Sequence, residues 1–136
     1  MANQAFSDQE KAAMRDRARE AREFKKLSGE EQIRIKLAEY SQEDRDLAMA
    51  VNDLVLETAP QLKPRTWYGM PAYYLDDKVI CFFQSKGQFK TRYSTFGFQE
   101  AANLDDGNFW PLSFALIELD DKTRKMIAGL VKKAIS

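Results

Sequence analysis

The chain has 136 residues, with 21 basic and 21 acidic side chains and no histidine. A net charge of zero removes the main driving force for general nucleic-acid binding and for attraction to a membrane surface, and the lack of histidine removes the commonest general base and metal ligand. The length suits one domain with its own core, and no run approaches the roughly 18 apolar residues of a membrane span.

The single cysteine, Cys81, lies in an apolar run at 79–83. One cysteine cannot form an internal disulfide or a thiolate metal cluster, so we interpret it as a small buried hydrophobe and not a reactive thiol. A chain without disulfides suits a reducing compartment, and residues 1–6 lead into a charged segment instead of the apolar stretch of a signal peptide. The sequence therefore predicts a cytoplasmic protein.

Three helix starts are marked by a serine followed three residues later by an acid, at Ser7, Ser28 and Ser41. In each, the serine oxygen can accept from a free backbone N–H, and the acid suits the positive end of the helix dipole. These signals predict helices over about 8–26, 29–39 and 42–58.

The first of these helices consists almost entirely of charged residues and alanine, so it has only a weak apolar stripe to bury. We interpret residues 1–27 as a helical extension that lies loosely on the domain, swings free or packs on a second copy. Seven basic residues are interspersed with five acids, which favours a solvated face over a nucleic-acid contact.

The next two helices carry apolar residues at helical spacing and are predicted to face the core. These residues are Ile33, Leu37 and Tyr40 in one, and Leu47, Val51, Leu54, Val55 and Thr58 in the other.

The sheet is predicted in the aromatic segment that follows, because 13 of the 16 aromatic residues lie between Trp67 and Phe114. Turn residues break this segment into short apolar runs, which is typical of consecutive antiparallel strands. The predicted strands are 65–68, 72–75, 78–84 and 89–96. In the last, Phe89, Thr91, Tyr93 and Thr95 alternate with polar residues.

The C-terminal third supplies a fifth strand and a last helix. Residues 110–119 are predicted as the strand, with Pro111 placing its start at an edge or bulge. Asp120 is the predicted cap of a helix over about 121–135, whose apolar face is Met126, Ile127, Leu130, Val131 and Ala134. The prediction is an α+β domain over 28–136, with an antiparallel sheet of about five strands packed against helices and the extension at 1–27.

The pair Ala59-Pro60 and the run Trp67-Tyr68-Gly69-Met70-Pro71-Ala72-Tyr73 resemble the YdhG-like family of small bacterial domains of unknown function. The resemblance covers about 33–135 and leaves the first helix as an addition. It implies an α+β fold with an antiparallel sheet backed by helices. One member of the family is described as a frataxin-like iron chaperone, and there are no established catalytic residues to carry over.

A metal site in this chain needs oxygen ligands. Iron is the metal that the resemblance implies, and paired acids in turns can hold a hard cation. The alternative is that acids in such positions serve only as turn residues and helix caps. The candidates are Asp76, Asp77, Asp105 and Asp106, with Glu118, Asp120 and Asp121 as further acids.

A small-molecule pocket is the second candidate, because the aromatic residues exceed what a core of this size needs. Arg65, Lys90 and Arg92 are the basic residues that can meet an anionic group. The alternative is that the rings fill the helix–sheet interface. The candidate ligand-binding residues are Trp67, Tyr68, Tyr73, Lys90, Arg92, Tyr93 and Trp110.

Two surfaces are candidates for forming a homodimer or for binding a protein partner, namely the charged first helix and the segment 110–119. The chain has no Ser-His-Asp set, no Gly-rich phosphate loop and no Walker lysine. We therefore predict a binding or carrier protein in place of an enzyme. The leading named role, by resemblance, is an iron-chaperone-like one, and the alternatives are a small-molecule pocket and a protein-interaction module.

Overall fold

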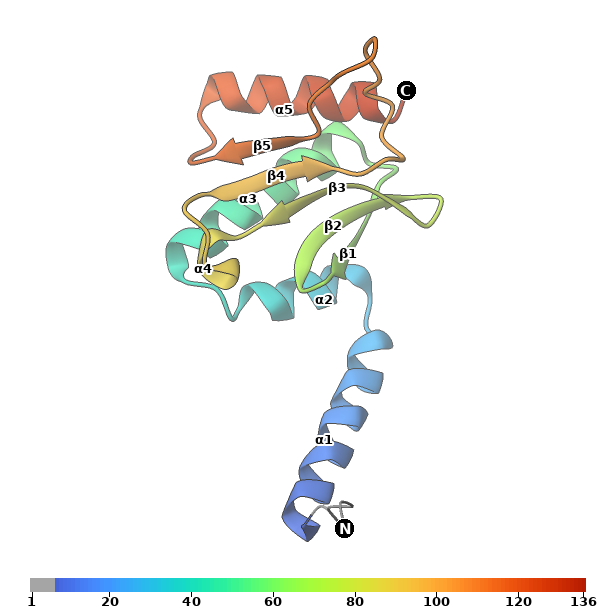
Figure 1. The fold of residues 1–136 in the computed structure, drawn as a ribbon, viewed down its shortest axis with the longest axis vertical. Coiled ribbons are helices and arrows are strands. Elements are labelled where there is room, and N and C mark those ends of the chain that lie inside the picture. The colour runs from blue at the N-terminus through green and yellow to red at the C-terminus, as the bar shows by residue number, and fades with distance from the viewer. Residues whose placement is uncertain (1–6) are drawn as a thin grey trace.

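The computed structural model describes residues 7–136, and the predicted absence of a signal peptide, which concerns residues 1–6, lies outside the described part. Residues 7–136 form five helices and one five-stranded sheet (Figure 1), so the predicted α+β class is confirmed. The elements are α1 (Asp8–Lys25), α2 (Gly29–Leu37), α3 (Gln42–Thr58), β1 (Lys63–Trp67), β2 (Met70–Leu75), β3 (Lys78–Gln84), α4 (Lys86–Phe89), β4 (Ser94–Phe98), β5 (Ser113–Leu116) and α5 (Asp121–Ala134).

The sheet is an antiparallel meander in the order β1-β2-β3-β4-β5, so β1 and β5 are its edges. Two-residue turns join the first three strands, at Tyr68-Gly69 and Asp76-Asp77, and all four residues have positive φ. Two positive φ angles in succession are the signature of type I′ turns, whose twist matches that of the strands they connect. Glycine and aspartate suit them because both tolerate the left-handed conformation.

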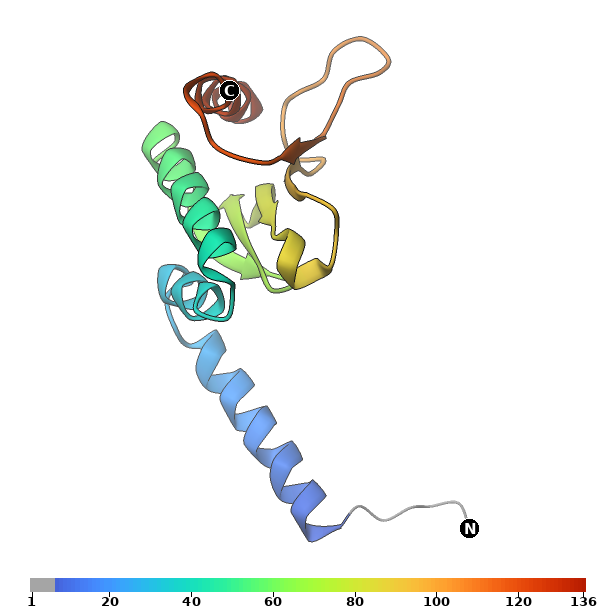
Figure 2. The ribbon, with the colours of Figure 1, turned by 90° about the vertical axis from the view of Figure 1, so that its left-hand side faces the viewer.

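One face of the sheet packs against α2, α3 and α5, and the main core lies between them (Figure 2). The side chains at its centre are fully buried and come from strands and helices alike: Tyr73, Phe83, Phe96 and Phe98 from the sheet, and Leu37, Val51, Val55 and Val131 from the helices. Most of the predicted helix faces are confirmed. Met126 is an error, because it is 56% exposed on α5.

The predicted fourth strand at 89–96 is wrong at its beginning. Residues Lys86–Phe89 form the short helix α4, Lys90 ends it in the left-handed conformation, and β4 begins only at Ser94. The fifth strand is also shorter than predicted, at Ser113–Leu116. The alternation of Phe89, Thr91 and Tyr93 therefore belongs to a helix end and a loop.

Helix α1 projects away from the body of the domain (Figures 1 and 2), and none of its residues over Asp8–Lys25 is buried. Its base is nevertheless fixed. The buried Gln32 amide donates to the carbonyl oxygens of Phe24 and Leu27, at 3.3 Å each, and its own oxygen accepts from the Thr66 hydroxyl at 3.1 Å. The junction between α1 and α2 is thus tied to the sheet by one side chain.

The three predicted serine caps are confirmed, because Ser7, Ser28 and Ser41 each accept a hydrogen bond from the backbone N–H three residues on. Only the first is a complete reciprocal capping box with its acid, Glu10. Within residues 7–136, no helix combines the length and apolar character that crossing a membrane requires.

Cys81 is fully buried in the core, and burial raises the pKa of its thiol. Because the thiolate is the reactive form, we expect a thiol-specific reagent to leave the native protein unlabelled at neutral pH and to label one thiol per chain in denaturant. Mass spectrometry after timed exposure measures this. Rapid complete labelling of the native protein, at the rate of the denatured chain, would contradict the buried position.

Candidate functional site

The structure separates the seven predicted ligand-binding residues. Trp67 and Tyr68 lie at the β1–β2 turn, where Tyr68 is 81% exposed, and Tyr73 lies in the main core. The Tyr73 hydroxyl donates to Asn52 Oδ1 at 2.8 Å, and burial raises the pKa of Tyr73. A fully enclosed ring with its hydroxyl already bonded serves the core and offers no surface to a ligand.

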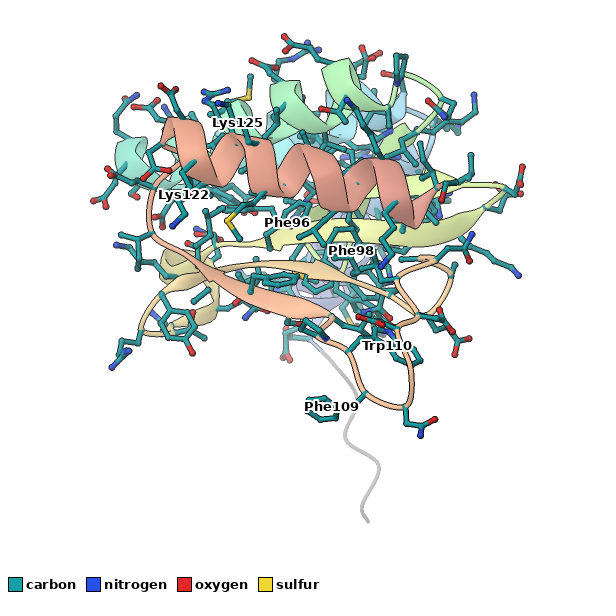
Figure 3. The ribbon with its side chains drawn as sticks, turned by 90° about the horizontal axis from the view of Figure 1, so that it is seen from above. Phe96, Phe98, Phe109, Trp110, Lys122 and Lys125 are labelled. Carbon is teal, nitrogen blue, oxygen red and sulfur yellow. The ribbon has the colours of Figure 1, made fainter. Side chains whose placement is uncertain are left out.

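The other predicted binding residues lie elsewhere on the molecule. Lys90, Arg92 and Tyr93 are exposed in the loop after α4, where the Arg92 guanidinium lies 5.3 Å from the Tyr93 ring centre. Trp110 packs against the edge of the core, whereas its neighbour Phe109 points away from the body (Figure 3).

The predicted metal ligands are in turns and at a helix cap. Asp76 and Asp77 form the β2–β3 turn, and Asp105 and Asp106 lie in the loop before β5. Asp120 caps α5, where hydrogen bonds from the Thr123 side chain and N–H lower its pKa. In the described part of the chain, no three Asp, Glu, Cys or His side chains come close enough together to hold a metal ion. Turn and capping roles account for these positions, and the iron role stays a prediction.

The face of the sheet opposite the main core has its own aromatic cluster. Met70, Ala72, Tyr74 and Phe82 are buried there, with Trp67 and Val79 packed against them. The Trp67 and Phe82 rings are 5.4 Å apart, and the Phe82 ring lies over Gly97, where a side chain would meet it. This second cluster is built from strand residues alone.

A hollow of about 460 Å³ lies beside this cluster, and we call it the Arg65 hollow. The Arg65 guanidinium carbon is 4.3 Å from the Tyr74 ring centre, a cation–π distance that holds the cation above the ring. The volume is in the range of small-molecule sites. The residues that line it are Gly29, Lys63, Pro64, Arg65, Tyr74, Asp76 and Asp77.

The charges around the Arg65 hollow do not neutralise one another by direct contact. Within residues 7–136, none of Lys63, Arg65, Asp76 and Asp77 takes part in an ion pair. Lys63 and Arg65 are two apart on β1 and so extend from the same face. Arg65 is among the anion-binding candidates predicted from the sequence, whereas Lys63 is not, because the predicted strand begins at residue 65 and β1 begins at Lys63.

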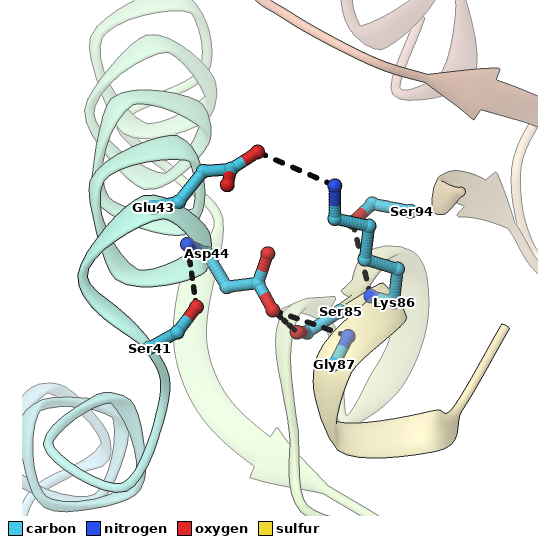
Figure 4. Close-up of polar contacts among 7 residues, drawn as sticks. All are labelled: Ser41, Glu43, Asp44, Ser85, Lys86, Gly87 and Ser94. Carbon is cyan, nitrogen blue, oxygen red and sulfur yellow. Dashed lines mark hydrogen bonds and ion pairs between the residues drawn. The ribbon is translucent and has the colours of Figure 1, made fainter. Parts of the chain in front are cut away.

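Apart from the Arg65 hollow, a cluster of polar side chains around Asp44 joins α3 to α4 (Figure 4). The Asp44 carboxylate, only 4% exposed, accepts from the Ser85 hydroxyl at 2.9 Å and from the Gly87 N–H at 3.1 Å. Lys86 and Glu43 form an exposed ion pair at 3.3 Å beside it, and the Lys86 N–H donates to the Ser94 hydroxyl at 3.0 Å. From the sequence, Asp44 is predicted only as the acid that follows the Ser41 cap.

This Asp44 cluster brings an acid, two serines and a lysine together, yet it is built as a structural joint. The cavity that it borders has about 40 Å³, room for about one water molecule and too little for a substrate. The buried carboxylate oxygen and both serine hydroxyls already have partners inside the protein.

Comparisons with protein-family models, with curated proteins and with solved structures found no match to this chain. The resemblance to the YdhG-like family therefore rests on the residues quoted for it, and the function must be argued from the site.

Proposed function

We propose that this chain is a binding protein and that the Arg65 hollow is its ligand site. The observation that carries the proposal is that two cations and two carboxylates, none of them in an ion pair, line one hollow beside the Tyr74 ring. Charged side chains left without partners at a concave surface are available to a ligand that carries the complementary charges.

The arrangement favours a small zwitterion, such as a free amino acid. The Arg65 guanidinium can bind a carboxylate through two parallel hydrogen bonds, and its position over the Tyr74 ring reduces the freedom it must lose on binding. On the other side, Asp76 and Asp77 sit in a tight turn and can accept from an ammonium group.

A binding role agrees with the predicted carrier class and with the absence of a recognisable catalytic set in the sequence. The predicted cytoplasmic location belongs to this proposal, and it is supported by a lone buried thiol that forms no disulfide. The iron-chaperone-like role is tested by the same experiment, because two of its predicted donors, Asp76 and Asp77, line the hollow.

We expect free amino acids to raise the melting temperature, because a ligand that binds only the folded state stabilises it by mass action. Differential scanning fluorimetry measures this. The panel holds amino acids, the matching amines without a carboxylate, the matching acids without an amine, inorganic phosphate, and ferrous iron under anaerobic conditions. In Arg65→Ala the shift with amino acids should disappear.

The matched control is Arg92→Ala, which removes the other arginine that lies over a tyrosine, in the loop after α4. This variant should show the same rise in melting temperature with amino acids as the wild type. An equal response in Arg65→Ala, or no response to any zwitterion or acid, would contradict the proposal. A shift with ferrous iron alone, lost when Asp76 and Asp77 become asparagine, would support the iron role in its place.

A further inference from the structure

The strand β5 ends the sheet with a free edge. It pairs with β4 on one side, and within the described residues no strand lies on its other side. The Phe98 N–H donates to the Leu112 carbonyl at 2.7 Å, which continues the β4–β5 ladder by one position. Since backbone groups alternate in direction along a strand, the N–H and C=O groups of Ser113 and Ala115 point away from β4, and the strand ends before a bend at Ile117.

Along residues 112–117 this edge carries no charge or proline that would keep another strand away, although the strand is only four residues long and Pro111 and Glu118 flank it. Exposed edges are commonly guarded by lysine, proline or a bulge. Ile117 is 75% exposed at one end of the segment, and Phe109 is 93% exposed near the other (Figure 3). Ile117 thus adds exposed apolar area at one end of this edge, whereas Phe109 stands apart in the loop before it.

The opposite edge of the sheet, β1, is protected from pairing with another strand. On β1, Pro64 has no N–H to offer, Lys63 and Arg65 bring charge, and the start of α2 lies so close that a methyl group on Gly29 would overlap the Pro64 carbonyl oxygen. One edge is thus covered and charged, while the other is open and apolar.

We propose that a second copy of this chain pairs with β5, antiparallel and about a two-fold axis at Ala115. In this register Ser113 lies opposite Ile117 of the partner subunit, and Ala115 lies opposite Ala115 of the partner subunit. The outward N–H and C=O groups of Ala115 then bond to those of Ala115 of the partner subunit, and the small Ala115 side chain leaves room at the axis. The two sheets become one of ten strands, five from each copy.

The neighbouring side chains and charges suit a symmetric pair. On the helix-covered face, Phe114 meets Leu116 of the partner subunit, so the two cores become continuous. The acids that follow β5, Glu118, Asp120 and Asp121, lie at opposite ends of an antiparallel pair, whereas a parallel pair would set them side by side. An isologous contact of this kind closes on itself and needs no other partner.

The test places a negative or a positive charge at position 115, on the proposed axis, in the full chain. Ala115 is exposed in one copy, so Ala115→Glu and Ala115→Lys should each fold, as circular dichroism can verify. In the pair, however, two like charges would face each other across the axis. By light scattering we expect twice the mass of one chain for the wild type and the mass of one chain for either variant. An equal mixture of the two variants should recover the double mass.

Met49→Glu, which adds the same charge at an exposed apolar position on α3, is the control and should keep the double mass. A wild type with the mass of one chain at every concentration would overturn the proposal, as would an Ala115→Glu variant that keeps the double mass. If both Ala115 variants fold but keep the mass of one chain when mixed, the axis does not lie at Ala115. A mass that keeps rising with protein concentration would contradict a closed pair, because it would show that the chains form an open assembly.

Discussion

Gly29→Ala is expected to lower the free energy of unfolding by about 3 kcal/mol or more, at the upper end of what overpacking costs. A methyl group at Gly29 would overlap the carbonyl oxygen of Pro64, and that atom belongs to the backbone of β1 and cannot rotate away. Helix α2 would therefore have to move off the edge strand. Urea unfolding followed by tryptophan fluorescence measures the change.

Gly129→Ala is the matched control because it makes the same substitution inside α5, where a methyl group meets nothing within 4 Å. Alanine is the better helix former by about 1 kcal/mol, so this variant should be more stable than the wild type by up to that amount. Opposite signs for the two variants are the prediction. A Gly29→Ala midpoint at or above that of the wild type would show that α2 does not lie against β1 as described.

Asp44→Ala is expected to be the second most damaging change, with a loss of about 3 kcal/mol. The carboxylate accepts two hydrogen bonds in a buried place, and hydrogen bonds to a charged group contribute about 1.5–3 kcal/mol, with a further cost when the donors are left unsatisfied. The Ser85 hydroxyl is fully buried and would lose this acceptor. Chemical denaturation gives the stability, and the amide resonance of Gly87 reports the local loss.

Asp46→Ala controls for the removal of an acid from the same helix. Asp46 is exposed and, among residues 7–136, its side chain accepts only from the Gln42 side chain at 2.9 Å, so its loss should change stability by no more than about 0.5 kcal/mol. Equal effects of the two substitutions would mean that the contact between α3 and α4 contributes nothing to the fold.

Local signals in the sequence were enough to predict four of the five helices and the number of strands. The serine caps and the spacing of Ile33, Leu37 and Val51 are properties of neighbouring residues, and the structure uses them as predicted. The start of β4 was not predicted because it depends on a contact between residues that are far apart in the sequence. Residues 86–89 are helical in a place where Asp44, more than forty residues earlier, accepts from Ser85 and Gly87.

The candidate site was harder to predict because the sequence does not say which face of the sheet a ring occupies. The pairing of β2 with β3 shifts register between Tyr73 and Tyr74. After such a bulge, simple alternation fails, and the neighbours Ile80 and Cys81 both belong to the main core. On β2 the alternation is intact, with Tyr73 in the main core and Tyr74 on the opposite face. Because the sequence does not say which of these faces the helices cover, Tyr73 was grouped with the ligand residues and Tyr74 was left out of the site.

The projection of α1 has a mechanical consequence. Eighteen residues at 1.5 Å rise make a rod about 27 Å long, so a rotation of about 10° at its base displaces the far tip by about 5 Å. The hydrogen bonds from Gln32 to Phe24, at the end of this rod, and to Leu27, just beyond it, therefore hold the point about which the rod would turn. A small change in the contacts that Gln32 and Lys36 on α2 make with the base of α1 would therefore be amplified into a large displacement of the charges at its tip.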